Sequence, residues 1–226
     1  MLADMVTPGN RLVDIGCDHG FLSIYLVSER ICPKALAMDV REGPLTAAGT
    51  HVAEWGLEDY IEIRLSDGLK KYRTGEADTM VCAGMGGRLM KRILEEGMDK
   101  AAGMKELILQ PQSELPEFRS FLRQAGFRVT QEDAIREDGK YYFAMKAVPV
   151  REQTHRCQPL YDQYGELLLK GRHPVLLQYL RQRESYVRQL EASLFAADSQ
   201  KAKNRLEEVG DELKGIEEAL TFFWEG

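Results

Sequence analysis

The sequence has few cysteines and no long apolar run. Its four cysteines among 226 residues form no CxxC pair and no regular spacing, which argues against a disulfide framework and a zinc cluster. No apolar segment approaches the ~20 residues needed to cross a bilayer. Residues 1–10 lack the basic-then-apolar pattern of a signal peptide. We therefore expect a protein of the reducing cytoplasm with no membrane association.

Metal-ligand spacing and an excess of positive charge are also missing. The four histidines show no such spacing and no Ser-His-Asp arrangement is evident, so we predict no metal and no such triad. The net charge of −6 opposes nucleic-acid binding on average, but partners respond to local patches. Residues 151–205 carry ten Lys and Arg against six Asp and Glu, while residues 206–226 carry one against seven. The basic stretch fits either an RNA-binding patch or a solvated helix face.

Short apolar runs alternate with amphipathic runs over the first 150 residues, which is typical of βα units on a mainly parallel sheet. The expected strands are Arg11–Ile15, Ala35–Asp39, Ile61–Leu65, Thr79–Cys82 and Glu106–Gln110. The expected helices are Phe21–Glu29, Pro44–Glu54, Gly87–Glu96 and Leu115–Gln124. Two further runs, Phe127–Ile135 and Tyr141–Val148, flank a turn-like segment and predict a terminal β-hairpin.

Proline at position 149 ends the strand pattern, so we predict a domain boundary between residues 1–150 and residues 151–226. A short helix is expected at Gln158–Leu169, then a long one from Pro174 to about Phe195. Another is expected from Asp198 or Ser199, both good N-caps. Apolar residues in both long helices recur every three or four positions, which predicts an antiparallel coiled coil of two helices.

A glycine-spaced turn follows the first strand, in the stretch Asp14-Ile-Gly-Cys-Asp-His-Gly20. A ligand is expected at the carboxyl end of such a strand. Asp14 and Asp18 flank Gly16, and two carboxylates would repel a diphosphate but attract the ammonium and sulfonium charges of S-adenosylmethionine (SAM). The loop therefore favours SAM over a dinucleotide.

Acidic residues also end the second and third strands. Asp39 lies about 20 residues past the glycine turn, where a carboxylate can accept hydrogen bonds from ribose hydroxyls. Asp67, before Gly68, is expected either beside the adenine or as the N-cap of a following helix. His19 is expected to orient a loop or a ligand, because no nucleophile is evident beside it; a general base is the alternative.

Two motifs follow the fourth and fifth strands on the same edge. Ala83-Gly-Met-Gly-Gly87 has three glycines in five residues, which indicates close approach of the backbone to a ligand or a tight turn. Gln110-Pro-Gln112 offers amide groups that can contact a base edge, or forms an ordinary strand-to-helix loop.

Together, Asp14–Gly20, Ala83–Gly87 and Leu109-Gln-Pro111 resemble the TrmK-type bacterial tRNA (adenine-N1)-methyltransferases, which modify the adenosine at tRNA position 22. The resemblance covers essentially the whole chain. It implies a class I SAM-dependent methyltransferase fold, a Rossmann-like α/β sheet, followed by an α-helical coiled-coil domain. This sequence departs from the family at Cys17, where serine or threonine is usual, and at Gln112, where asparagine is usual.

The resemblance implies roles for these residues. The SAM contacts would be Asp14, Gly16, Asp18, His19, Asp39, Asp67, Gly68, Ala83, Gly84 and Met85, while Gly86, Gly87, Gln110, Pro111 and Gln112 would border the target base. N1 of neutral adenine has a lone pair and needs no strong base, so positioning is expected to dominate catalysis. Asp18 is the candidate catalytic residue, because its charge could offset the positive charge on the alkylated ring.

Basic residues of the helical region are candidates for contact with the tRNA backbone: Lys170, Arg172, Arg181, Arg183 and Arg188. The alternatives are that the coiled coil is a dimerisation arm or a scaffold. A SAM-dependent enzyme acting on a small molecule or protein would have the same fold, as would a non-catalytic protein that binds an adenosine ligand and assembles through its coiled coil. The sequence does not determine the oligomeric state; we favour a monomer.

Overall fold

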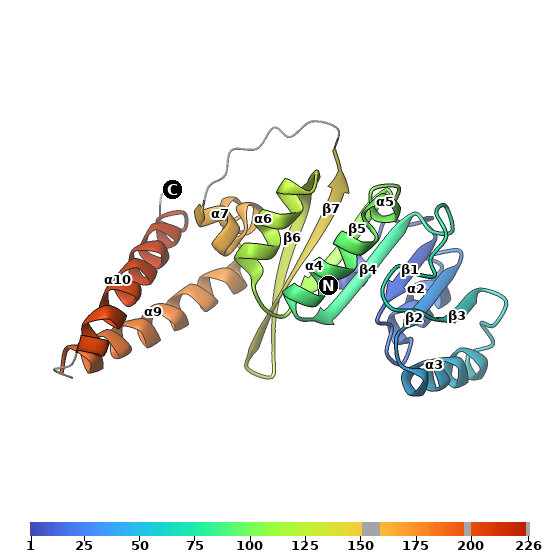
Figure 1. Ribbon diagram of the computed structural model, residues 1–226, viewed down its shortest axis with the longest axis horizontal. Coiled ribbons are helices and arrows are strands. Elements are labelled where there is room, and N and C mark those ends of the chain that lie inside the picture. Colours follow the sequence, from blue (N-terminus) through green and yellow to red (C-terminus); the bar gives the residue numbers. More distant parts are fainter. Residues whose placement is uncertain (151–158, 197–199, 225–226) are drawn as a thin grey trace. The chain divides into compact units, whose positions relative to one another are not determined.

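The computed structural model describes residues 1–150, 159–196 and 200–224 (Figure 1). These residues form two compact units. The first contains residues 1–133 and 142–150, and the second contains residues 134–141, 159–196 and 200–224. The tip of the terminal β-hairpin thus belongs to the helical unit. The predicted boundary at residue 150 stays a prediction, because residues 151–158 lie outside the described part of the chain.

The first unit contains a seven-stranded sheet with the order β3-β2-β1-β4-β5-β7-β6. Strands β1 to β5 run parallel, and β7 pairs antiparallel with β5. Their bounds are β1 Leu12–Ile15, β2 Ala35–Asp39, β3 Ile61–Leu65, β4 Thr79–Met85, β5 Glu106–Pro111, β6 Phe127–Glu137 and β7 Lys140–Pro149. The predicted methyltransferase-type sheet is confirmed.

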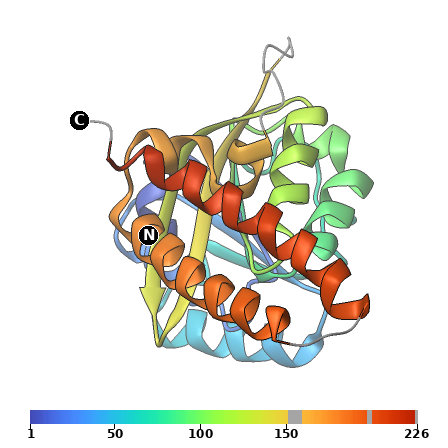
Figure 2. The ribbon, with the colours of Figure 1, turned by 90° about the vertical axis from the view of Figure 1, so that its left-hand side faces the viewer.

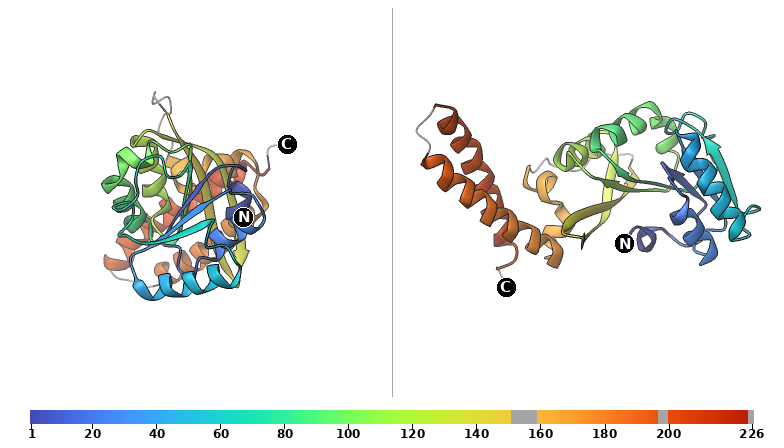
Figure 3. Two further views of the ribbon diagram at one scale, coloured as in Figure 1. Left: turned by 90° about the vertical axis from the view of Figure 1, so that its right-hand side faces the viewer. Right: turned by 90° about the horizontal axis from the view of Figure 1, so that it is seen from below.

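Helices cover both faces of this sheet (Figure 3, right). One face packs against α1 Leu2–Met5, α2 Phe21–Ser28 and α3 Glu42–Glu54, and the other against α4 Gly87–Glu96, α5 Met98–Ala101 and α6 Leu115–Gln124. Successive strand residues alternate between the two cores, so Leu12 packs on the α2 side and Val13 on the α4 side. Burial on both faces explains why the strands read as continuous apolar runs.

A two-residue turn at Asp138-Gly139 joins β6 and β7. Both residues have positive φ, 48° and 78°, as tight hairpin turns require. The two strands extend beyond the predicted runs by two residues at the end of β6 and by one at each end of β7. The hairpin is therefore confirmed, and it is longer than predicted.

The helical unit begins with two short helices rather than one. The predicted helix Gln158–Leu169 is wrong as a single element, because the chain forms α7 Pro159–Tyr164 and α8 Glu166–Lys170. Gly165, between them, has a φ of 89°, which is incompatible with a continuous right-handed helix. Gln158 lies outside the described residues.

Two long helices, α9 Pro174–Phe195 and α10 Gln200–Thr221, pack side by side as a hairpin (Figure 2). Their buried apolar residues are Leu176, Leu180 and Val187 on α9, with Ala202, Val209, Leu213, Ile216, Ala219 and Leu220 on α10. Arg183 interrupts the predicted apolar stripe of α9, and its Nε donates to Glu212 of α10 at 2.5 Å. The predicted N-caps Asp198 and Ser199 lie outside the described residues.

Candidate active site

The acidic and glycine-rich loops singled out in the first unit gather at one edge of the sheet. They follow the carboxyl ends of β1 to β5, which lie side by side because these strands are parallel. Backbone hydrogen bonds hold the loops to neighbouring strands: Gly16 N donates to Met38 O at 2.7 Å, and Gln112 N donates to Met85 O at 2.8 Å. The predicted SAM-contacting residues, with Gly86, Gly87, Gln110, Pro111 and Gln112, therefore share one rim.

The loop after β1 requires an unusual backbone. Gly16 and Gly20 have φ values of 73° and 75°, and Asp18 has a φ of 50°, which is uncommon for a residue with a side chain. A Cβ on Gly16 would lie 2.0 Å from Met85 Cε. Gly16 is therefore favoured chiefly for its conformation, because the flexible end of the Met85 side chain could move away from a Cβ.

Asp14 lies beneath this loop. Its side chain accepts a hydrogen bond from Ser23 Oγ at 2.9 Å, and the residue is only 5% exposed. Burial raises the pKa of the Asp14 carboxyl to about 6, and the nearby charge of Asp39 adds to this. Asp14 thus holds the first turn of α2 against β1, and its direct contact with a ligand stays a prediction.

Asp39, at the end of β2, is also nearly buried and organises the loop. It accepts from the backbone N–H of Arg41 at 2.9 Å and of Asp18 at 3.3 Å. A carboxylate accepts about four hydrogen bonds, so capacity remains for two hydroxyl donors. The next residue, Val40, is 61% exposed and presents an apolar surface beside this carboxylate.

Asp18 and His19 are exposed at the top of the loop. The Asp18 carboxylate lies 3.6 Å from Arg41 Nη2 and 3.8 Å from His19 Nε2. Both contacts are solvent-exposed and are weak on that account. The side chain of Asp18 thus remains accessible to a charged ligand.

Asp67 follows β3 and is paired with cations. Lys70 Nζ donates to it at 2.6 Å and Arg92 Nη2 at 3.2 Å. The hydrogen bond from Lys70 lowers the pKa of the Asp67 carboxyl. The alternative of a helix N-cap is wrong, because residues 66–78, all described, contain no helix.

The Ala83–Gly87 segment is explained largely by contacts within the protein. Strand β4 continues through Ala83 and Gly84 to Met85, with a register shift against β5. Gly84 has a φ of 74°. A Cβ on Gly87 would lie 2.4 Å from the carbonyl oxygen of Ser113. The close approach that these glycines permit is thus to the β5–α6 loop, and their contact with a ligand stays a prediction.

Gln110 joins the same two loops from β5. Its Oε1 accepts from Gly84 N at 2.9 Å. Its Nε2 is buried and has no hydrogen-bond partner among the described residues. An unpaired buried donor costs about 1–3 kcal/mol, so this rim is incomplete without an added acceptor. Pro111 is buried and Gln112 is exposed.

Sequence reasoning missed an aromatic cluster beside the glycine loop. The ring of Phe21 stacks on His51 at 4.7 Å and on His19 at 5.9 Å between centroids. His51 Nδ1 also lies 3.0 Å from the carbonyl oxygen of His19. Phe21 is 61% exposed, so the cluster offers an aromatic surface to solvent. The only signal in the sequence is a large aromatic residue at the start of a helix.

Cys17, the first departure from the family pattern, lies in the loop after β1, and its side chain is buried. Burial raises the pKa of its thiol to about 12, so it remains protonated at neutral pH. Its backbone N–H donates to Met38 O at 3.0 Å. The substitution therefore places a small apolar group where an alcohol is usual.

The predicted tRNA-contacting cations lie in the helical unit, and three of them pair with carboxylates. Lys170 pairs with Glu166, Arg183 with Glu212, and Arg188 with both Glu184 and Glu217. Arg181 instead lies over the ring of Trp224 at 5.2 Å. Arg172, the fifth predicted cation, is exposed and follows the end of α8.

Residues 1–150, 159–196 and 200–224 contain neither a metal-type cluster nor a membrane-spanning helix. No group of three or more His, Cys, Asp or Glu side chains there could hold a metal ion. No helix in these ranges is long and apolar enough to span a membrane.

Residues 1–145 match a methyltransferase domain family. The tRNA (adenine(22)-N(1))-methyltransferase of Bacillus subtilis (strain 168) is 33% identical over 231 residues, covering 97% of this chain and 94% of that protein. The crystal structure of the B. subtilis m1A22 tRNA methyltransferase TrmK has 30% identity and a TM-score of 0.85, covering 97% of this chain and 95% of that one.

A Streptococcus pneumoniae protein in complex with S-adenosyl-L-methionine is similar as well. It has 31% identity and a TM-score of 0.85, over 97% of this chain and 96% of that one. Both units of the chain are thus covered by these similarities. The resemblance seen in the sequence motifs is confirmed, and the chain belongs to the tRNA (adenine(22)-N(1))-methyltransferase family.

Proposed function

We propose that this chain transfers the methyl group of SAM to N1 of adenosine 22 in tRNA. The observation that carries the proposal is the gathering of Asp14, Asp18 and Asp39 around one glycine loop, in a chain that matches its family over nearly its whole length. Because this substrate is a cytoplasmic RNA, we also propose that the protein acts in the cytoplasm.

The charges of the loop fit SAM. SAM carries an ammonium and a sulfonium group, which Asp14 and Asp18 attract, whereas a pyrophosphate would be repelled by the same carboxylates. Asp14 loses little of its charge at pH 7, since its pKa is about 6. The electrostatic field of the loop is therefore negative where a dinucleotide site needs positive charge.

Neighbouring groups fit the nucleoside part of SAM. Asp39 retains acceptor capacity for the two ribose hydroxyls, and the exposed side chain of Val40 provides an apolar surface for the adenine ring. Asp67 accepts from two cations and can accept further from the exocyclic amine, beside Gly68. These contacts are consistent with the roles that the family resemblance implies.

When bound, SAM supplies an electrophilic methyl group. The chain itself has to orient the adenine so that its N1 lone pair faces that methyl, and orientation of two reactants accounts for much of the rate enhancement in such reactions. Met85, at the end of β4, lies against Gly16 of the glycine loop, and Gln110 is joined to Gly84 by a hydrogen bond, so both border the same edge. Gln110 Nε2 lacks a partner among the described residues, and an acceptor on the target base would complete it.

Asp18 is the proposed electrostatic residue of the reaction, because N1-methyladenine is cationic. We expect Asp18→Asn to weaken SAM binding, since the exposed carboxylate attracts the positive charge of SAM. We also expect it to lower kcat, since the same carboxylate would offset the positive charge of N1-methyladenine. Initial rates and SAM dissociation constants of the two proteins check this. Normal SAM affinity together with wild-type turnover would remove Asp18 from the mechanism.

The function is tested by incubating the protein with labelled SAM and unmodified tRNA, followed by nucleoside analysis. The expected product is 1-methyladenosine, and a tRNA with guanosine at position 22 should remain unlabelled. SAM binding without methylation of any tRNA would instead favour an enzyme acting on a small molecule or a protein. Binding without turnover on any substrate would favour a ligand-binding assembly protein.

A further inference from the structure

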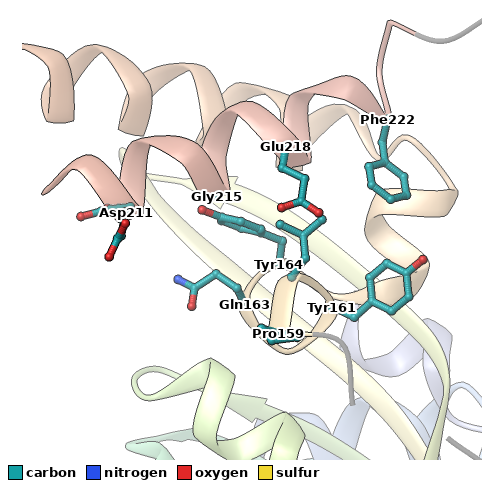
Figure 4. Close-up of a pocket in the computed structure, with 10 residues that line it drawn as sticks. Pro159, Tyr161, Gln163, Tyr164, Asp211, Gly215, Glu218 and Phe222 are labelled. Carbon is teal, nitrogen blue, oxygen red and sulfur yellow. The ribbon is translucent and has the colours of Figure 1, made fainter. Parts of the chain in front are cut away.

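Two hollows that described residues of the helical unit line differ in electrostatic character. The larger, about 700 Å³, is lined by Tyr161, Tyr164 and Phe222 together with Asp211, Glu212 and Glu218 (Figure 4). No Lys or Arg is among the described residues that line it. Its carboxylates would repel a phosphate backbone, so this hollow is unsuited to RNA.

The smaller hollow, about 290 Å³, lies between the tip of the β6–β7 hairpin and the N-terminal half of α9. It is lined by three tyrosines, an arginine, a glutamine and a glycine, namely Tyr141, Tyr179, Tyr186, Arg183, Gln182 and Gly139. All six belong to the second unit. None of them is acidic, which distinguishes this tyrosine pocket from the larger hollow.

Hydrogen bonds and ring contacts fix the walls of the tyrosine pocket. Tyr141 and Tyr179 meet edge to face, with ring centroids 5.3 Å apart and planes at 76°. The Tyr141 hydroxyl donates to Gln182 Oε1 at 2.8 Å, which leaves the Gln182 amide nitrogen as a donor toward a ligand. Preorganised aromatic walls lower the entropic cost of binding a flat ring.

Two guanidinium groups accompany the rings. Arg183 lies over Tyr186 at 5.1 Å, and Arg136 lies over Tyr141 at 5.5 Å. Arg183 is partly neutralised by Glu212, whereas Arg136 is exposed at the hairpin. Aromatic faces with adjacent arginines are the combination by which proteins hold unpaired bases and their phosphates.

We infer that the tyrosine pocket binds one unpaired tRNA base other than the adenosine that is methylated, with the base stacked on Tyr186. Tyr186 is 54% exposed and Arg183 covers one face of its ring, so a base would stack on the opposite face. The pocket volume of about 290 Å³ is just below the roughly 300–1,000 Å³ of drug-sized ligand pockets, which suits a single nucleobase. This inference rests on the proposed function and adds a second RNA contact in the helical unit.

The test compares tRNA affinity of the full-length chain and three variants. Tyr186→Ala removes the stacking ring, Tyr186→Phe keeps it, and Phe195→Ala removes another ring of α9, 71% exposed and outside the pocket. We expect Tyr186→Ala to weaken binding of unmodified tRNA by about 5- to 100-fold, the range for loss of one stacked base. The other two variants should bind within about twofold of wild type, since neither removes a stacking ring from the pocket.

The salt dependence of tRNA affinity distinguishes a loss of base stacking from a loss of charge–charge attraction. Because tyrosine is neutral, the loss on Tyr186→Ala should be the same factor at low and high salt, and it should be absent with duplex RNA. Helical circular dichroism verifies that the variant is folded. If wild type forms 1-methyladenosine and Tyr186→Ala still binds tRNA normally, the pocket inference is overturned and the function stands. If wild type binds no tRNA, both are overturned.

Discussion

The ionised carboxylate of Asp14, beside the proposed SAM site, destabilises the folded protein because it is buried. Its carboxyl group is nearly buried, and Ser23 is the side chain that donates to it. The pKa of about 6 means that the folded protein holds the proton more tightly than the unfolded chain, whose Asp groups titrate near 3.9. We propose that this buried charge is retained because it attracts a cationic ligand.

Asp14→Asn tests this cost through the pH dependence of stability. Because the folded pKa is raised, the contribution of Asp14 is fully present below about pH 4 and is lost as the pH rises through 6. We expect the variant to be more stable than wild type by about 2 kcal/mol at pH 8 and to differ little at pH 4. Urea unfolding at both pH values measures this. A difference independent of pH would contradict it.

Gly87 provides a second test at a single residue. A Cβ there would overlap the backbone oxygen of Ser113, which cannot rotate away. We expect Gly87→Ala to destabilise the protein by about 1–3 kcal/mol and to disturb the β4–α4 loop. The matched control is Gly49→Ala in α3, where no atom lies within 4 Å; it should be neutral or stabilising by roughly 0.5–1 kcal/mol. Equal melting temperatures for both variants would show that the loops are not in close contact.

At the level of elements, apolar periodicity predicted most bounds correctly. Strands β2 and β3 and helices α4 and α6 begin and end at the predicted residues, since their apolar side chains are buried in the two cores that flank the sheet. The short helices α1 and α5 were missed because four residues are too few to show a period. The break at Gly165 was missed because glycine within an apolar run does not reveal the sign of its φ.

The common position of the candidate site residues could be predicted where they follow a strand, but contacts between distant segments could not. The acidic residues at the ends of β1, β2 and β3 could be placed on one edge from topology alone. The stacking of Phe21 on His51 joins segments 30 residues apart and has no local pattern. The need for glycine at position 87 arises from Ser113, on another loop. Such contacts depend on loop conformation rather than on periodicity.

Replacing Gly210, in the middle of α10, by alanine is expected to stabilise the helical unit. No atom lies within 4 Å of its added Cβ, and the residue is in a 22-residue helix without positive φ. Gly210→Ala should therefore stabilise the unit by about 1 kcal/mol through helix propensity. Thermal unfolding followed by helical circular dichroism measures this. A lower melting temperature would mean that α10 is bent or packed closely at this point.

For the molecule as a whole, the acidic net charge and an RNA substrate are compatible because charge is divided between surfaces. In the helical unit Glu212 pairs with Arg183 and, with Asp211 and Glu218, also lines the larger hollow. Arg136 and Arg181 instead lie over aromatic rings. An RNA backbone is therefore expected to meet the arginines that accompany rings rather than the acidic hollow.

Removal of the helical region tests whether the first unit binds SAM by itself and whether the helical unit contributes to tRNA binding. The cores of the sheet are formed by residues 5–147 and all SAM-site residues precede residue 113, so a chain ending at Val150 should bind SAM within about twofold of wild type. It should bind tRNA at least about tenfold more weakly and with a smaller salt dependence, because Lys170, Arg181 and Arg188 are removed. Calorimetry with SAM and filter binding at two salt concentrations measure both. Retained tRNA affinity in a folded truncation would make the coiled coil a scaffold and would place RNA recognition in the sheet unit.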